Sequence, residues 1–347
     1  MMRSRGGSRH LLTGITLVLS VSTALPVRAE GDPQDWLVRM GHALGSLNYE
    51  GTLVQMHGND AAVMHVVHRV DGGVGAERIT AMDEVGREII RRGDEVTCIF
   101  PDQRTVVVGR RSSIANGTSP LRQQFPDDAR FDDEYYRFAI ASGGRLVGRS
   151  TWLVTVKPMD QYRYGYQLWL DRDTAMPLKV QIHASDGAVV EQLLFSEISL
   201  PAEIPAAALN PSASTEGFSW RQSDTVGAEP PLARARPASP VWRATSLPPS
   251  FRLHTARSRR VDSGDAPMEH LVYSDGLVNV SVFVESGVNA TGQGEGVSRI
   301  GAANAYTEMT GTWLVTAVGE VPVRTVEMIA RSLQRTDGDP TAGEIGN

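Results

Sequence analysis

The strongest constraint on the fold is a series of short β-type segments that recur about every ten residues between residues 49 and 108. Turn-forming residues such as Asp71-Gly72-Gly73 and Gly93-Asp94 separate these segments. No helical pattern of the length that a parallel crossover needs lies between them. We therefore expect one continuous antiparallel sheet with strands at 49–56, 62–70, 78–82, 87–92, 96–100 and 104–108.

One amphipathic helix precedes this sheet. Asp32 is a good N-cap residue, and Pro33 suits the first helical position. Apolar residues then recur at helical spacing and form a single stripe, made of Trp36, Leu37, Met40, Ala43, Leu44 and Leu47. Such a stripe must be buried, so we expect the helix to cover one face of the sheet.

More strands follow a polar stretch at 112–138, within which a short helix is expected around 132–140. The predicted strands are 146–157, 162–171, 178–184 and 189–198. Alternation places Tyr162, Tyr164 and Tyr166 on one face of their strand. We favour a packed sheet face with hydroxyl groups at its rim, and an apolar cavity is the alternative. If the cavity forms, the candidate residues for binding an apolar ligand such as a lipid are Trp36, Met40, Tyr162, Tyr164 and Tyr166.

The stretch 201–240 contains seven prolines and loses all periodicity, which is typical of a linker. A second sheet unit follows, with strands at 251–260, 269–273, 278–285 and 313–318 and a final helix from Pro322. The fold class is α+β, mostly antiparallel β, with a large N-terminal domain and a smaller C-terminal α+β domain. The predicted divisions are a signal peptide at 1–29, domains at 30–200 and 241–335, the linker at 201–240 and a polar tail at 336–347.

The first thirty residues have the features of a secretory signal peptide. Three arginines precede an apolar run at 11–25, and Val27 and Ala29 fit the subsites of a signal peptidase. We predict cleavage after Ala29, and an uncleaved anchor is the alternative. Cleavage removes four arginines and no acidic residue, so the formal charge of −6 becomes −10. No later segment is apolar enough to cross a bilayer, which predicts an exported protein.

Composition and motifs argue against several functional classes. The negative charge argues against a general nucleic-acid binder. The single cysteine, Cys98, excludes an intramolecular disulfide and a cysteine-rich zinc site, and we expect it to be a buried strand residue. His65 and His68 are three apart in a strand and point to opposite faces, so they cannot share a metal. No complete phosphate loop or nucleophile elbow occurs. No enzyme activity, metal or cofactor is predicted.

Several separated motifs resemble the MucB/RseB family. They are Leu47-Asn48-Tyr49-Glu50-Gly51-Thr52, Arg87-Glu88-Ile89-Ile90-Arg91, Tyr162-Arg163-Tyr164-Gly165-Tyr166, Tyr273-Ser274-Asp275-Gly276-Leu277, Val280-Ser281-Val282-Phe283 and Gly319-Glu320-Val321-Pro322. The resemblance runs from the signal peptide through the last helix. It implies an N-terminal domain similar to the lipoprotein carriers, an open half-barrel sheet with helices in its concavity, and a smaller C-terminal domain.

The resemblance also implies a function without a reaction. Members of this family are periplasmic negative regulators of an envelope-stress sigma factor. They bind the periplasmic domain of a membrane anti-sigma factor of the MucA/RseA type and protect it from the site-1 protease. Lipopolysaccharide or the acyl chains of mislocalised lipoproteins are the implied signals, sensed by the N-terminal domain. A periplasmic lipid or lipoprotein carrier is the alternative, although a carrier does not need residues 241–335. A structural envelope protein is a third functional class. The sequence also leaves open whether the protein forms a homo-oligomer.

The C-terminal domain is expected to bind the partner. The hairpin from Tyr273 to Phe283 is its most regular candidate for an exposed edge, and edge strands capture extended peptides. Four arginines add positive charge to this domain of an acidic chain, which favours an acidic partner segment, although each alone is an ordinary surface residue. The candidate partner-binding residues are Arg257, Arg259, Arg260, Tyr273, Phe283 and Arg299.

Overall fold

The computed structural model describes residues 31–110, 120, 121, 125, 132–212, 214–222, 241–259, 268–286 and 295–336, without the side chains of residues 258, 259, 286 and 300. The predicted signal peptide and almost all of the predicted polar tail lie outside these residues. Within them, no helix has the length and apolar character that crossing a membrane requires.

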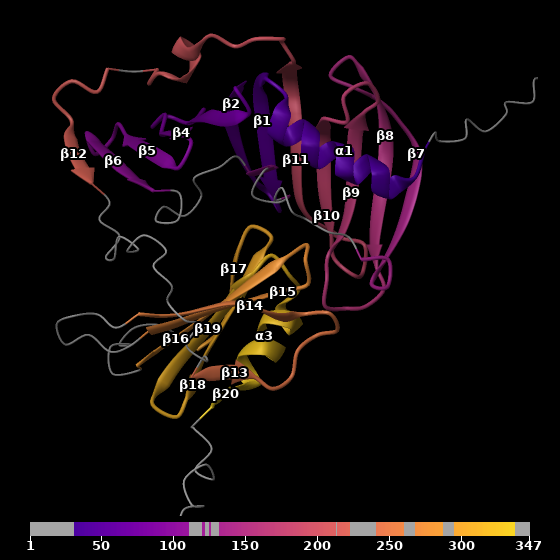
Figure 1. Ribbon diagram of the computed structural model, residues 1–347, viewed down its shortest axis with the longest axis vertical. Helices are drawn as coiled ribbons and strands as arrows, with labels where there is room; N and C mark the ends of the chain where they lie inside the picture. The colour runs from indigo at the N-terminus through magenta and orange to yellow at the C-terminus, as the bar shows by residue number, and fades with distance from the viewer. Residues whose placement is uncertain are drawn as a thin grey trace, which may run out of the picture.

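A large sheet of twelve strands forms the N-terminal part of the molecule (Figure 1). Its strand order is β12-β6-β5-β4-β3-β2-β1-β11-β10-β9-β8-β7. The strands are β1 (Tyr49–His57), β2 (Asp60–Asp71), β3 (Val74–Ala81), β4 (Glu88–Arg92), β5 (Glu95–Phe100), β6 (Thr105–Arg110), β7 (Tyr136–Leu146), β8 (Arg149–Pro158), β9 (Gly165–Asp171), β10 (Pro177–His183), β11 (Val189–Ser199) and β12 (Ser219–Gln222). All neighbours are antiparallel except β12 and β6.

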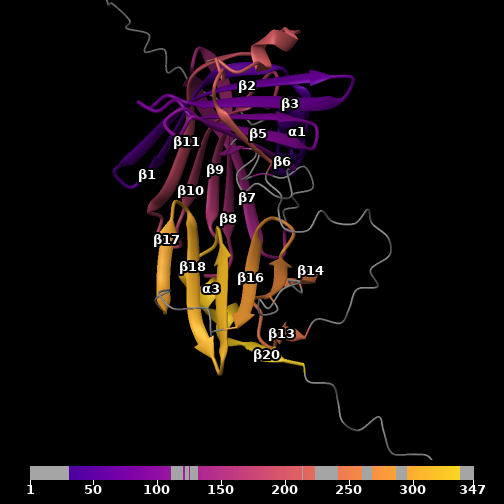
Figure 2. The ribbon, with the colours of Figure 1, turned by 90° about the vertical axis from the view of Figure 1, so that its left-hand side faces the viewer.

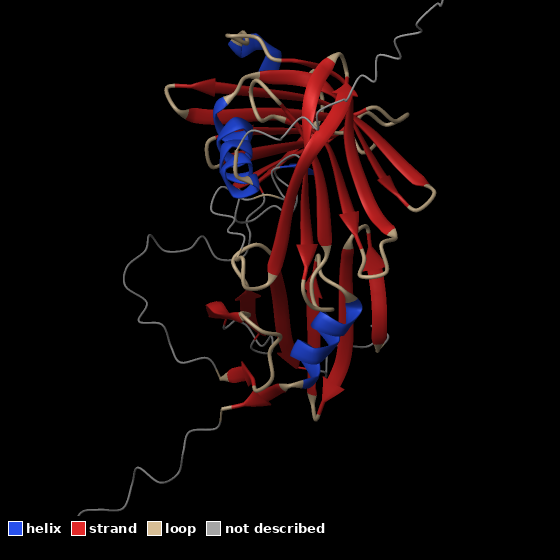
Figure 3. Ribbon diagram, turned by 90° about the vertical axis from the view of Figure 1, so that its right-hand side faces the viewer, coloured by secondary structure: helices blue, strands red, loops and turns tan. Residues whose placement is uncertain are grey.

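The two edges of this sheet, β12 and β7, are different strands, so the sheet is open. It is strongly curved around the helix α1 (Figure 3). This arrangement confirms the expected fold class, a large open antiparallel sheet followed by a smaller α+β unit. β1 lies in the interior of the sheet and pairs with β2 on one side and β11 on the other.

The helix α1 (Pro33–Ser46) confirms the predicted amphipathic helix. The Asp32 carboxylate accepts a hydrogen bond from the backbone N–H of Gln34 at 2.9 Å, which caps the N-terminus. The helix lies along the inner face of the sheet (Figure 3), and all residues of its apolar stripe except the half-buried Leu47 are buried. The Trp36 ring meets that of Trp152 on β8 edge to face, with centroids 6.4 Å apart.

The short helix expected around residues 132–140 is wrong. Residues 132–135 form a turn, and β7 begins at Tyr136. Tyr136 is buried and Phe138 and Ile140 pack at the margin of the core, whereas Arg137 is exposed. This alternation has the period of a strand, and pairing with β8 decides the structure.

The beginning of the predicted linker packs against the large sheet. Ile204 and Leu209, the latter in the 3-10 helix η1 (Ala206–Leu209), are buried with Val67 of β2. β12 then pairs in parallel with β6. Residues 201–222 therefore belong to the N-terminal unit in the structure. Residues 223–240 lie outside the described residues, so the other end of the linker stays a prediction.

The smaller unit is a six-stranded antiparallel sheet with the order β14-β15-β16-β19-β18-β17. It lies beyond one end of the large sheet (Figure 2). Helix α3 (Val323–Arg331) packs on β18 and β19, and a two-stranded sheet joins β13 to β20. The strands are β13 (Trp242–Ala244), β14 (Arg252–Arg259), β15 (Met268–Ser274), β16 (Asn279–Ser286), β17 (Gly296–Ile300), β18 (Ala303–Thr310), β19 (Trp313–Gly319) and β20 (Leu333–Arg335).

Candidate functional site

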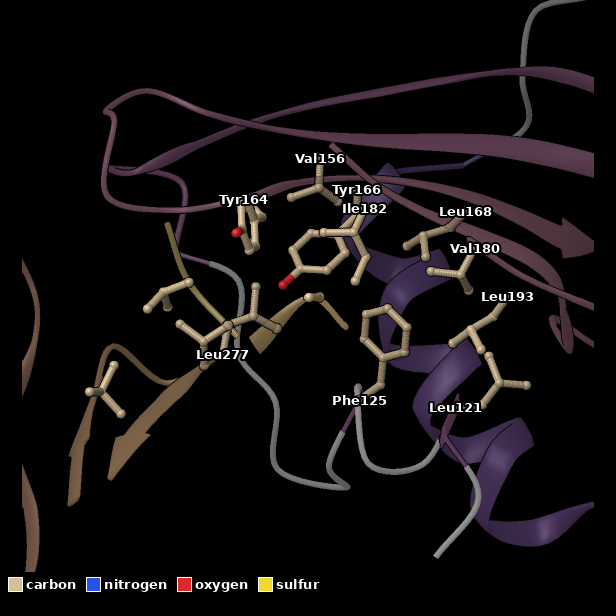
Figure 4. Close-up of a cluster of buried hydrophobic side chains, with 14 of the residues drawn as sticks. Leu121, Phe125, Val156, Tyr164, Tyr166, Leu168, Val180, Ile182, Leu193 and Leu277 are labelled. Carbon is tan, nitrogen blue, oxygen red and sulfur yellow. The ribbon is translucent and has the colours of Figure 1, made fainter. Parts of the chain in front are cut away.

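The predicted lipid-binding residues lie mostly in one packed core. Tyr164 and Tyr166 are buried on the inner face of the large sheet, beside Val180 and Ile182 (Figure 4). The ring of Phe125 meets that of Tyr166 edge to face, with centroids 5.8 Å apart. Burial raises the pKa of both tyrosine hydroxyl groups above the ordinary value of 10.

Trp36 and Met40 reach the same core from α1, and both are buried. Tyr162 differs, because its side chain is only half-buried. Its carbonyl accepts a hydrogen bond from the hydroxyl of Thr325 on α3 at 2.7 Å. Four of the five predicted residues therefore share the core, whereas Tyr162 lies where the two units meet. Lipid binding at this core stays a prediction.

A buried arginine joins the two units. Arg163 precedes β9 and has none of its surface exposed. Its Nε donates to Asp275 of the β15–β16 turn at 2.7 Å, and its Nη1 donates to Asp160. Nη2 donates to the Ser250 hydroxyl at 2.5 Å. Asp275 is itself 1% exposed, so this pair is shielded from water, and either charge alone would be costly there.

A second set of contacts lies around the β17–β18 turn, and we call it the carboxylate junction. Glu191 of β11 accepts a hydrogen bond from the backbone N–H of Ala302 at 2.9 Å. The side-chain amide of Asn304 donates to the Tyr164 hydroxyl at 2.8 Å and to the Val321 carbonyl at 2.6 Å. Next to Val321, burial and the nearby Glu191 raise the pKa of Glu320 to about 7.

Three of the motifs quoted for the family resemblance meet at this boundary between the units. Arg163 belongs to the tyrosine-rich motif at 162–166, Asp275 to the motif at 273–277, and Glu320 to the motif at 319–322. Sequence reasoning missed these three residues as a site because each is isolated in its own segment. The one available signal was an arginine between two tyrosines at the start of a predicted strand, since an arginine in such a setting needs a partner if it is buried.

The predicted partner-binding residues whose side chains the structure describes do not form one patch. Tyr273 is 1% exposed, and its hydroxyl accepts a hydrogen bond from the backbone N–H of Ala244 at 2.8 Å. Phe283 stacks on His270 on the opposite face of the sheet, with ring centroids 4.4 Å apart, and Arg257 lies opposite His270 in the register. Tyr273 is therefore a core residue, whereas Arg257 and Phe283 share the outer face.

Of the other three predicted arginines, the structure describes the side chain of Arg299. The Arg299 Nε donates to Asn304 at 3.0 Å, which places it beside the carboxylate junction. Arg259 ends β14, and its side chain lies outside what the structure describes, as does the whole of Arg260.

The hairpin predicted as an exposed edge is in the interior of the smaller sheet. β15 pairs with β14 as well as with β16, and β16 also pairs with β19. The expectation of an edge is wrong because the sequence does not show which distant strand flanks a hairpin. The edges of this sheet are β14 and β17.

Potential metal ligands do not gather in the part of the chain that the structure describes: it contains no group of three or more His, Cys, Asp or Glu side chains placed to hold a metal ion. Cys98 on β5 is buried, as expected, and burial raises the pKa of its thiol. The buried polar side chains Arg163, Asp275, Glu191 and Asn304 form hydrogen bonds between the two units.

The fold and the junction define a class of two-unit β proteins in which an open, curved sheet is fastened to a smaller sheet by a buried ion pair. The chain belongs to the MucB/RseB family, since the family's N-terminal domain matches residues 32–213 and its C-terminal domain matches residues 236–334. The family resemblance noted in the sequence is thereby confirmed.

Relatives and solved structures agree with this assignment. The chain is 28% identical over 328 residues to the sigma factor AlgU regulatory protein MucB of Pseudomonas aeruginosa, covering 93% of this chain and 97% of that protein. It is 26% identical over 330 residues to the sigma-E factor regulatory protein RseB of Escherichia coli, covering 93% of this chain and 96% of that protein.

Two solved complexes are similar in structure along most of the chain. The crystal structure of MucB in complex with MucA(peri) has a TM-score of 0.64 at 25% identity and covers 88% of this chain and 100% of the other. The complex structure of Pseudomonas aeruginosa MucA/MucB has a TM-score of 0.66 at 25% identity and covers 89% of this chain and 100% of the other.

Proposed function

We propose that this protein binds the periplasmic domain of a membrane anti-sigma factor and so restrains an envelope-stress sigma factor. The observation that carries the proposal is the similarity to MucB as seen in its complex with MucA(peri), which extends over 88% of this chain and includes both units. Bound in this way, the protein protects the anti-sigma factor from the protease that would otherwise release the sigma factor.

The direct test uses the mature full-length chain and the periplasmic domain of the anti-sigma factor from the same organism. Isothermal titration calorimetry should show saturable binding, and the bound domain should resist the site-1 protease longer than the free domain does. Absence of binding at concentrations of tens of micromolar would overturn the proposal. Binding without protection would restrict it to a scaffolding role.

We propose that the protein acts in the periplasm after cleavage following Ala29. Support comes from Val27 and Ala29, which fit the signal-peptidase subsites, and from the charged and apolar regions before them. N-terminal sequencing of the protein from a periplasmic extract should begin at Glu30. A membrane-retained form that begins at Met1 would contradict this proposal.

We also propose that the N-terminal unit senses a lipid. The core that contains Tyr164 and Tyr166 lies next to the contact of Tyr164 with Asn304 in the smaller unit. An acyl chain that enters this core would therefore disturb the boundary between the units. A ligand can regulate the partner only if it favours the state that binds the partner less well, and the partner must then weaken the ligand equally.

Binding of a fluorescent acylated ligand tests this part. Tyr164→Asp places a carboxylate in the core and should abolish binding to the mature chain, whereas Asp186→Asn in the exposed β10–β11 turn should not. Equal binding by the parent chain and the Tyr164→Asp variant would overturn lipid sensing at this core. Tight lipid binding without any anti-sigma binding would favour the carrier instead.

We propose that the C-terminal unit contacts the anti-sigma factor through the outer face of the smaller sheet. Arg257 and Phe283 lie on this face, Arg257 exposed and Phe283 half-buried. Arg257→Ala should weaken binding of the anti-sigma domain and reduce its salt dependence. Arg243→Ala, which removes an exposed arginine of β13, is the matched control. Equal binding by both variants would remove Arg257 from the interface.

A further inference from the structure

β7 is a long edge strand of the large sheet. It pairs with β8 along one side, and no strand lies along its other side in the part of the chain that the structure describes (Figure 1). Most of its side chains beyond Tyr136 are exposed or half-buried. An edge of this kind presents backbone N–H and C=O groups that an extended peptide can pair with.

The hairpin that contains this edge is basic. Residues 136–158 contain four cationic side chains and no acidic one, and the cations are Arg137, Arg145, Arg149 and Lys157. The whole chain has 40 acidic and 34 basic residues, so the hairpin departs from the overall charge. Its field favours an acidic partner.

Three arginines line a cavity of about 390 Å³ at the turn of this hairpin. Arg149 pairs with the buried Asp171 at 2.9 Å. The partners that the structure shows for Arg172 are neutral: its Nε and Nη2 donate to the Thr151 carbonyl at 3.2 Å and to the Ser142 hydroxyl at 3.0 Å. These contacts orient the guanidinium group without neutralising its charge.

Arg145 contributes a second charge of this kind, since the partners that the structure shows for it, the Gly148 carbonyl and the Ser150 hydroxyl, are also neutral. A bulge between Ser142 and Gly144 changes the register of β7 just before Arg145. The exposed Asp173 also lines the cavity and offsets one positive charge. With Arg149 matched by its own carboxylate partner, the cavity keeps one net positive charge, which suits a carboxylate.

We propose that the β7 edge and this arginine-lined cavity form a docking site for an acidic, extended segment of the anti-sigma factor. The segment pairs with β7 as an additional strand and places a carboxylate against Arg145 and Arg172. The identity of the partner rests on the proposed function. A peptide is the favoured occupant because an edge strand presents a row of alternating N–H and C=O groups, which another strand matches and the acceptor oxygens of a single phosphate group do not.

Charge reversal tests the cavity. Arg145→Glu changes an exposed side chain, and Arg221→Glu on β12 makes the same change at the opposite edge of the sheet. We expect the dissociation constant of the anti-sigma periplasmic domain to rise about tenfold for Arg145→Glu and less than about twofold for Arg221→Glu, with a weaker salt dependence in the first variant. Arg172→Gln, which retains hydrogen-bond donors, should give an intermediate loss.

Hydrogen exchange tests the edge. Amides within residues 139–146 should exchange more slowly in the complex than in the free protein. Protection confined to β12, β14 or β17 would overturn the proposal, as would unchanged affinity in both Arg145→Glu and Arg172→Gln. If instead these two variants lose binding to vesicles with anionic lipid but keep the anti-sigma domain, the cavity binds a headgroup and the peptide proposal is refuted. Absence of any binding by the parent chain would refute the proposed function, a result distinct from each of these.

Discussion

Replacing Asp275 by asparagine would test the buried ion pair that joins the two units. The Asp275 Oδ1 atom accepts hydrogen bonds from the backbone N–H groups of Leu277 and Val278 at 3.0 Å, and an asparagine carbonyl can keep both. The Oδ2 atom faces Arg163 at 2.7 Å, and there the charge is lost. Removing one partner of a buried pair costs about 3–5 kcal/mol. Because Asp160 remains beside the arginine, we expect a loss of about 2–4 kcal/mol.

Urea unfolding followed by far-UV circular dichroism measures this change in the free energy of unfolding. Asp186→Asn is the matched control, since Asp186 accepts a similar turn hydrogen bond from Ala188 at 2.9 Å but is exposed. We expect the control to change stability by less than about 0.5 kcal/mol. A loss below about 1 kcal/mol in Asp275→Asn would refute the reasoning.

A double-mutant cycle separates the pair from its surroundings. Arg163→Met leaves Asp275 without its cation, so it too should be strongly destabilising. Combined with Asp275→Asn, it should cost less than the sum of the two single changes by about 1.5 kcal/mol or more. Additive losses would mean that the two residues act independently. Small-angle scattering of Asp275→Asn should also show a larger radius of gyration, since the pair fastens one unit to the other.

Three further changes test other parts of the structure. In the folded chain the pKa of Glu320 is about 7, whereas its ordinary value is 4.5, so the melting temperature should fall as the pH rises from 4.5 to about 7. Glu320→Gln should reduce that fall, and equal falls in the parent chain and the variant would contradict this prediction. Tyr164→Phe removes the acceptor of a hydrogen bond from the amide of the smaller unit and should cost about 1 kcal/mol in urea unfolding, and no loss would show that the contact adds nothing. Gly51→Ala places a methyl group 2.4 Å from the Glu197 carbonyl and should cost more than about 2 kcal/mol, whereas Gly41→Ala in α1 meets nothing within 4 Å and should stabilise slightly.

Local patterns predicted most of the elements. The helix from Pro33 and the strands between residues 49 and 108 are visible in the sequence because their turns and alternation are local properties. β7 was mistaken for a helix because the acidic residues at 132–134 look like a first helical turn and pairing with β8 is not local. β18 was missed because its small and polar residues, such as Ala305 and Thr307, give no apolar alternation.

The sequence predicted which side chains of the candidate site share a face of one strand better than it predicted the contacts between distant segments. Tyr164 and Tyr166 were correctly placed on one buried face, which follows from the period of a strand. That Arg163 meets Asp275 could not be predicted, because the two residues are far apart in the sequence and lie in different sheets. The interior position of the strand that contains Phe283 could not be predicted for the same reason, since a strand is at an edge or in the interior according to which distant strand pairs with it.

The place of β1 in the large sheet affects how the chain folds as it emerges, N-terminus first, in the compartment where it acts. β1 can pair with β2 at once, because the two are joined by a short turn. Its other side pairs with β11, where Glu50 lies opposite Ser199, so that side waits for most of the N-terminal unit to emerge. During this interval the β1–β2 hairpin keeps an open apolar edge at which another chain can add. Chains that end before Val189 should therefore aggregate, whereas chains that extend through Ser199 can close this edge.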